Sequence, residues 1–119
     1  MAKRFLFIVR SFPHGAASAQ EALDVILTTA AMEQPVSVLF LEDGVLQLLD
    51  EQNPALVGLK HIAPIYQSLP IYDVESFWVE RESLEARGIA DRKLILPVDL
   101  IHRSGVAGLI ESHDITVTC

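Results

Sequence analysis

The sequence predicts a three-layer α/β/α fold, broadly flavodoxin-like, built on a five-stranded and mainly parallel sheet. Short apolar runs alternate along the chain with segments of helical pattern, as in folds that place helices on both faces of a sheet. The runs are nearly continuous rather than alternating, which is typical of strands covered on both faces. The chain has 119 residues, which is within the usual size of one domain, so we expect a single domain over residues 1–119.

The first three elements form the clearest unit. The runs FLFIVR, residues 5–10, and VSVLFL, residues 36–41, are predicted strands. Between them, apolar residues recur at spacings of four, three and four, at Ala19, Leu23, Ile26 and Ala30, which predicts an amphipathic helix. A helical crossover of this length joins parallel strands, so the unit is predicted to be a right-handed βαβ.

The rest of the chain repeats the alternation less regularly. Gly44 completes a turn with Glu42 and Asp43, and residues 45–58 are expected to be loop with a short helix at most. Gly88 suits the left-handed end of a helix. The remaining predicted elements are a helix from Ile62 or Ala63 to Tyr72, a strand over 76–80, a helix over 81–88, a strand over 93–98, a helix over 99–111 and a strand over 114–118, with Pro97 as a strand exit and Asp99 as a helix cap.

Charge and hydropathy limit the partners of the chain. Acidic groups outnumber basic ones by 16 to 9, a formal charge of -7, which disfavours binding to phosphate backbones and anionic lipid. Half of the residues are hydrophobic and the mean hydropathy is +0.34, but no run approaches the ~20 apolar residues of a membrane span. We expect a soluble, cytoplasmic protein whose apolar surface is partly covered by other subunits. A single cysteine excludes an internal disulfide.

The junction after the first strand is the first candidate for a ligand site. It contains Ser11, His14, Gly15 and Ser18 ahead of a helix whose free backbone amides could receive an anion. It lacks a GxGxxG motif and a P-loop lysine. We therefore interpret it as a structural corner, with His14 packed or at an interface, and an independent anion- or nucleotide-binding module remains the alternative.

Other motifs offer little support for catalysis. Glu42 and Asp43 could form an acidic metal-binding pair, as in a phosphoacceptor receiver domain. Such a domain also needs an aspartate at the end of its third strand and acids after its first, and those places hold Glu80 and Arg10 with Ser11. A solvated turn is therefore the preferred interpretation. HExxH, CxxC and GxSxG motifs are absent from the sequence. Cys119 is the last residue, and its own carboxylate disfavours a thiolate, so we predict an inert thiol.

Three segments carry a resemblance to a known family. They are FLFIVRSFPHGAASAQEALDVILTTAA, VSVLFLEDGVLQLL and LPIYDVESFWVERESLEARGI, and their order and spacing are more specific than any one motif in them. The chain resembles the DsrE/DsrF-like sulfur-relay family over nearly its whole length, and within that family the TusC-type (DsrF-like) subunits.

The resemblance implies a function through partners. TusC-type subunits assemble with TusB-like and TusD-like subunits into a heterohexamer with two of each, which relays persulfide sulfur for 2-thiolation of the wobble uridine in certain tRNAs. DsrEFH relatives serve dissimilatory sulfur oxidation. The family's acceptor cysteine lies mainly in the TusD/DsrE type of subunit, in the loop after the third strand. The matching positions here are Val79, Glu80 and Arg81, none of which can carry sulfur.

We therefore expect a non-catalytic structural subunit with no cofactor, no metal and no direct contact with nucleic acid or membrane. Two alternatives stay open, a DsrF-type role in sulfur oxidation and a thiol carrier that uses Cys119. The residues expected to contact a partner or lie near its sulfur site are His14, Gly15, Asp43, Gly44, Tyr72, Trp78 and Glu80.

Overall fold

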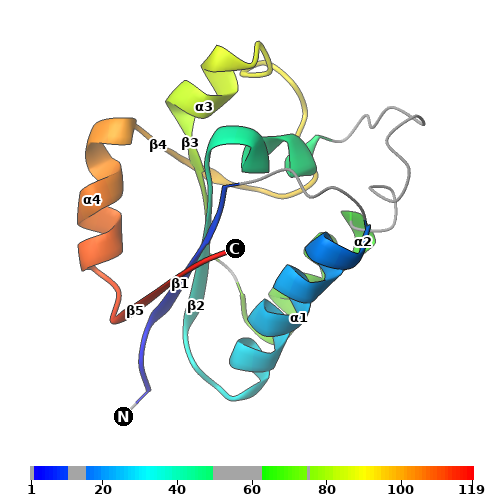
Figure 1. The fold of residues 1–119 in the computed structure, drawn as a ribbon, viewed down its shortest axis with the longest axis vertical. Helices are drawn as coiled ribbons and strands as arrows, with labels where there is room; N and C mark the ends of the chain where they lie inside the picture. Colours follow the sequence, from blue (N-terminus) through cyan, green and yellow to red (C-terminus); the bar gives the residue numbers. More distant parts are fainter. Residues whose placement is uncertain (1, 11–15, 50–62, 75) are drawn as a thin grey trace.

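A computed structural model describes residues 2–10, 16–49, 63–74 and 76–119 (Figure 1). Strands and helices alternate along the chain, as the sequence predicts. The elements are β1 (Phe5–Val9), α1 (Ala16–Ala31), β2 (Val36–Phe40), the 3-10 helix η1 (Glu42–Leu48), α2 (Ala63–Ser68), the 3-10 helix η3 (Leu69–Tyr72), β3 (Ser76–Glu80), α3 (Arg81–Ala86), β4 (Asp99–Ile101), α4 (Arg103–Glu111) and β5 (Ile115–Thr118).

The five strands form one sheet in the order β4-β3-β2-β1-β5, and every neighbouring pair is parallel. Figure 1 shows α1 and α2 on one side of this sheet and α4 on the other. The predicted α/β architecture with a five-stranded parallel sheet is therefore confirmed. Among the described helices, none is long and apolar enough to cross a bilayer.

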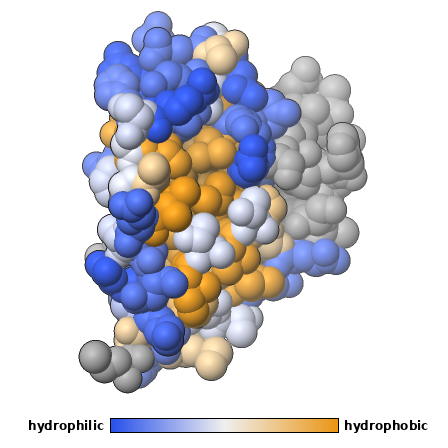
Figure 2. Space-filling view, turned by 60° about the vertical axis from the view of Figure 1, so that its left-hand side comes forward, coloured by the Kyte–Doolittle hydropathy of each residue, from blue (hydrophilic) through white to orange (hydrophobic). Residues whose placement is uncertain are grey.

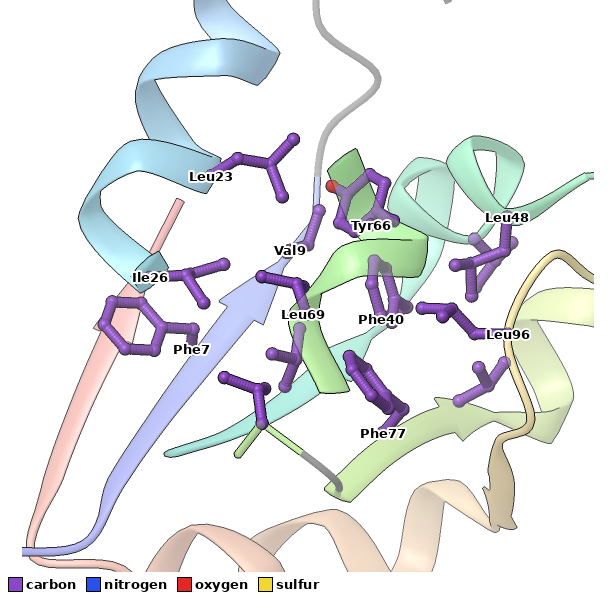
Figure 3. Close-up of a cluster of buried hydrophobic side chains, with 14 of the residues drawn as sticks. Phe7, Val9, Leu23, Ile26, Phe40, Leu48, Tyr66, Leu69, Phe77 and Leu96 are labelled. Carbon is purple, nitrogen blue, oxygen red and sulfur yellow. The ribbon is translucent and has the colours of Figure 1, made fainter. Parts of the chain in front are cut away.

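The larger core lies on the α1 side of the sheet. Leu23 and Ile26 of α1 are fully buried there, and Figure 3 shows them directed toward β1. The predicted apolar stripe is confirmed at these two residues, and Ala30 packs against the same core. The other large side chains of this core come from the strands and from the segments after β2, and they include Phe7, Val9, Phe40, Leu48, Tyr66, Leu69, Phe77 and Leu96.

The α4 side of the sheet has a smaller core. Its buried members are Leu6, Ile8, Leu39 and Leu41. The helix α4 contributes side chains to it but contains no fully buried residue. Figure 2 brings this side of the molecule forward and shows hydrophobic residues gathered on it, bordered by hydrophilic ones. The short helix α4 thus covers this face incompletely.

The predicted strand over 93–98 is wrong. Leu94 makes only an isolated antiparallel bridge with Leu49, and Ile95 donates its backbone N–H to the carbonyl of Leu48 at 2.8 Å. Leu96 is buried against the α1-side core. The apolar run therefore indicates burial of a loop segment beside η1 rather than a strand, and the fourth strand follows it at 99–101.

The predicted helix over 99–111 begins later than expected. Asp99 is the first residue of β4 rather than a helix cap, and His102 occupies the N-cap position of α4. The amide of Arg103 donates instead to the carboxylate of Glu82, at 2.9 and 3.0 Å. An acidic side chain from a neighbouring element thus caps this helix, which local sequence does not reveal.

Of two predictions about the local backbone, one is confirmed and the other is corrected. Gly88 follows α3 with a φ of +66°, which confirms the left-handed position after the helix. Glu42, Asp43 and Gly44 open the 3-10 helix η1 instead of forming an isolated turn. The part of the expected loop over 45–58 that the structure describes is helical up to Leu48, and residues 50–58 lie outside the described ranges.

Candidate functional site

The carboxyl ends of the strands form the candidate site, because ligands of open parallel sheets collect at that edge. Val9, Phe40 and Val79 are level with one another in the sheet. The segments that follow them are the residues after β1, the 3-10 helix η1 and the helix α3. β4 ends beside Glu80, and α4 begins two residues later.

Glu80 is the central acidic group of this edge. Its side chain is only 6% exposed, and its Oε1 accepts hydrogen bonds from Ser83 Oγ at 2.6 Å and from the guanidinium of Arg103 at 3.1 Å. Burial alone raises the pKa of Glu80, but these two hydrogen bonds and the charges of Arg103 and Arg87 outweigh it. The pKa of Glu80 therefore lies below its ordinary value, and the group is a fixed carboxylate at neutral pH.

Ser83 links three elements around that carboxylate. It is 1% exposed, donates to Glu80 and accepts the backbone N–H of Glu42 at 2.8 Å. The guanidinium of Arg87 donates to the backbone carbonyl of Ser83 and to Asp43 Oδ1. The start of η1 is thereby connected to the end of β3 and to α3.

Ion pairs continue the network to the surface. Arg10 pairs with Glu42 at 2.8 Å, and His102 lies 3.8 Å from Glu82. Both members of the Arg10 pair are about half-exposed, and exposed pairs of this kind contribute little to stability. Their effect is to neutralise charge locally, because each of these cationic side chains lies beside an acidic side chain of the same chain.

Gly44 allows η1 to approach β1 closely. A Cβ atom at this position would lie 2.0 Å from the carbonyl oxygen of Val9. The amide of Gly44 donates to the carbonyls of Arg10 and Leu41. A side chain there would separate the two segments and move Asp43 away from Arg87.

The arrangement does not suit nucleophilic catalysis by Ser83. An activated serine needs an adjacent base that can take its proton. Glu80 is the neighbouring acceptor, but its lowered pKa makes it a weak base, and Ser83 is inaccessible to a substrate. Across the ranges that the structure describes, no group of three or more His, Cys, Asp or Glu side chains could hold a metal ion.

Cys119 lies at the same edge, at the end of β5. Its amide donates to the carbonyl of Ile8 at 2.8 Å, and its side chain packs against the α1-side core. Burial raises the pKa of the Cys119 thiol. A thiol with a raised pKa is a poor nucleophile at neutral pH.

The structure brings together only some of the residues that the sequence singled out. The hydrogen bonds and ion pairs around Glu80 at the carboxyl ends of the strands are called the carboxyl-edge network below. Asp43, Gly44 and Glu80 belong to it. Tyr72 ends η3 and Trp78 lies in the middle of β3, so neither enters that network. His14 and Gly15 lie outside the described residues, and their role stays a prediction.

Sequence reasoning missed the partners of Glu80. Ser83 follows it by three residues, a spacing that places both on one side of the first turn of α3 and could have suggested the contact. Arg103 is 23 residues away and Arg87 is 44 residues from Asp43. These pairs depend on the order of strands in the sheet, for which the local pattern contains no signal.

Comparison with known proteins identifies relatives over the whole chain. The model of the DsrE/DsrF-like family matches residues 3–119. The "Protein TusC homolog" of Pseudomonas aeruginosa is 36% identical over 118 residues, covering 99% of both chains. The "Intracellular sulfur oxidation protein DsrF" of Allochromatium vinosum is 44% identical over 93 residues, covering 78% of this chain and 68% of that protein.

A solved structure supports the fold independently. The ychN protein of E. coli superposes with a TM-score of 0.77 at 20% sequence identity, and the match covers 100% of both chains. At this identity the likeness concerns the fold alone.

Proposed function

Because the chain belongs to the DsrE/DsrF-like family, we propose that it is a non-catalytic subunit of a sulfur-relay complex. The proposed partners are TusB-like and TusD-like subunits, in a heterohexamer with two copies of each. The complex passes persulfide sulfur on for 2-thiolation of the wobble uridine in tRNA. This chain holds a sulfur-accepting partner in position and carries no sulfur itself.

The observation that carries the proposal is that Glu80 is an ionised carboxylate held in a fixed position. The end of β3 presents a buried carboxylate fixed by Ser83 and Arg103. A carboxylate at this point disfavours a neighbouring thiolate, because two close negative charges repel each other. The chain's only cysteine, Cys119, has a raised thiol pKa. Both features favour a supporting role over direct sulfur transfer.

Exposed apolar side chains support a role in assembly. Among the described residues, five large hydrophobic side chains are about half-exposed or more, namely Val25, Met32, Ile71, Tyr72 and Leu100. The incompletely covered side shown in Figure 2 adds to them. Large exposed apolar areas mark interfaces, and we propose that partner subunits cover part of this surface.

Further parts of the proposal rest on charge and family. A formal charge of -7 argues against direct binding of tRNA by this chain, so downstream enzymes are proposed to bind the nucleic acid. We propose a cytoplasmic protein in which residues 1–119 form one domain. His14 and Gly15 are proposed to lie near the partner's sulfur site, beside Asp43, Gly44 and Glu80.

Co-expression tests the assembly. The full chain is produced alone and together with TusB-like and TusD-like chains, and the molar mass is measured by light scattering after gel filtration. We expect self-association or poor recovery of the chain alone and a discrete heterohexamer of the three. A stable monomer that ignores both partners would refute the proposal.

A DsrF-type role in sulfur oxidation is a second candidate, favoured by the 44% identity to the sulfur oxidation protein of A. vinosum. Deleting the gene in its own host distinguishes the two roles. Loss of 2-thiouridine from digested tRNA, measured by mass spectrometry, supports tRNA thiolation. Normal 2-thiouridine with impaired oxidation of stored sulfur supports the DsrF-type role.

The thiol-carrier alternative predicts a covalent adduct. Incubation with a persulfide donor would add the mass of one sulfur atom to the chain, and Cys119→Ser would abolish the gain. We expect no adduct on the folded chain, since burial disfavours the thiolate. A stoichiometric adduct would favour the carrier role instead.

A further inference from the structure

A recess lies at the opposite end of the sheet from the carboxyl-edge network. Its volume is about 430 Å³, within the range of small-molecule sites. It is bounded by the starts of β2 and β3, by the residue that follows η3, and by the end of α4. The lining residues include Arg4, Ser37, Asp73, Ser76, Trp78 and Leu109.

The recess exists because α4 is too short to cover its face of the sheet. Side chains alternate between faces along a strand, and Leu39 belongs to the α4-side core. Ser37 therefore lies on that same face of β2, as do Ser76 and Trp78 of β3, whose register with Ser37 and Leu39 is parallel. Leu109 packs against this core near the end of α4 and forms one wall.

Hydrogen-bond donors are among the groups that line the recess. Within the described part of the chain, Trp78 Nε1 and the hydroxyls of Ser37 and Ser76 have no hydrogen-bond partner. An indole N–H that is half-buried normally finds an acceptor. The Arg4 guanidinium forms an ion pair with Asp114 at 3.9 Å, a distance too long for a hydrogen bond. Both side chains of this pair are about half-exposed.

These groups select the chemistry of a ligand. Trp78 and Arg4 can only donate hydrogen bonds, and a serine hydroxyl can do so as well. The indole ring of Trp78 and the side chain of Leu109 provide apolar contact for a flat or branched body. Asp73 also lines the recess but is exposed to solvent, where its repulsion of an anion is weakened by water.

We propose that this recess binds a small apolar carboxylate, with the carboxylate received by Arg4 and Trp78 Nε1 and the apolar body against Trp78 and Leu109. The carboxylate belongs either to a free aromatic acid or to the C-terminal residue of a polypeptide. The site is separate from the carboxyl-edge network and does not depend on the proposed function.

The single tryptophan of the chain makes the test direct. The indole ¹⁵N–¹H resonance of Trp78 is followed in the full-length protein during titration with phenylacetate. Phenylacetamide and phenethylamine serve as probes with a similar ring and a neutral or positive group. We expect a saturable shift with phenylacetate, a weaker one with the amide and none with the amine.

Variants locate the site. Arg4→Gln is expected to weaken phenylacetate binding about tenfold or more, since it removes a charge-assisted hydrogen bond. Arg81→Gln makes the same change of charge on α3, at the other edge of the sheet, and should leave the affinity unchanged. Circular dichroism checks that both variants are folded.

Peptides separate the two sources of the carboxylate. A tetrapeptide ending in Phe is compared in its free-acid and amidated forms, beside phenylacetate. Tighter binding of the free-acid peptide than of phenylacetate assigns the recess to a polypeptide C-terminus, and the reverse assigns it to a free acid. The inference is overturned if the Trp78 signal is unmoved by all carboxylates at about 10 mM, a concentration that saturates even a millimolar site, or if Arg4→Gln and Arg81→Gln behave alike.

Discussion

Arg103, the first residue of α4, donates a 3.1 Å hydrogen bond to the buried carboxylate of Glu80, the last residue of β3. This contact fixes α4 to the end of β3. The acid is supported a second time by Ser83, which also holds the start of η1. One carboxylate therefore organises the edge at which related folds place their ligands.

Removing the charge of Glu80 should destabilise the chain. Glu80→Gln keeps the size of the side chain but loses the charge-assisted hydrogen bonds, and we expect the free energy of unfolding to fall by about 1–2 kcal/mol. Urea unfolding at neutral pH measures it. Glu85→Gln, which disturbs only the exposed pair with Arg81, is the control and should change stability little.

The same acid predicts a pH dependence. The pKa of folded Glu80 is lowered from its ordinary value of 4.5, so its stabilisation is present above about pH 4.5 and is lost as pH falls through the lower folded pKa. The difference in stability between the wild type and Glu80→Gln should shrink over that acid range. A difference that stayed constant down to acid unfolding would contradict the lowered pKa.

Two glycine substitutions should have opposite signs. Gly44→Ala places a Cβ atom 2.0 Å from a backbone oxygen of Val9, and we expect a loss of about 2–3 kcal/mol from the forced shift. Gly108→Ala meets nothing within 4 Å in α4 and should stabilise the chain by about 0.5–1 kcal/mol, since alanine favours helix. Thermal unfolding of both variants provides the comparison, and equal effects would speak against the close approach at Gly44.

The hydroxyl group of Tyr66 should contribute to the stability of the fold, and that of Tyr72 should not. The Tyr66 hydroxyl donates to Gln47 Oε1 inside the core, whereas Tyr72 is 49% exposed. Tyr66→Phe should cost about 1–2 kcal/mol, and Tyr72→Phe should stay within about 0.5 kcal/mol. Chemical unfolding of the two variants measures this, and a neutral Tyr66→Phe would show that the buried hydrogen bond contributes nothing net.

Cys119 should react slowly with alkylating reagents. Burial raises its pKa above the ordinary value of 9.0, so the rate of iodoacetamide modification should have its midpoint above pH 9.0. In urea the same thiol should titrate near the ordinary value and react faster at neutral pH. A midpoint below 9.0 in the folded chain would identify an activated thiol and revive the carrier hypothesis.

The sequence by itself determined which segments are buried and in what order strands and helices follow. Continuous apolar runs identified β1 and β2, the helical spacing identified the buried face of α1, and Gly88 marked the end of α3. The same signal failed at 93–98, where Leu96 is buried without pairing in the sheet. Hydropathy indicates only that a segment is removed from water, and a loop segment packed against the core is removed from water as a strand is.

Only the tertiary structure decided which polar groups meet. The strand order brings Arg103 to Glu80 and leaves the starts of β2 and β3 uncovered beside Trp78. Burial depends on each residue and its near neighbours, so the local sequence pattern indicates it. A contact between distant elements depends on sheet order, register and helix length together, and these are fixed only when the whole chain packs.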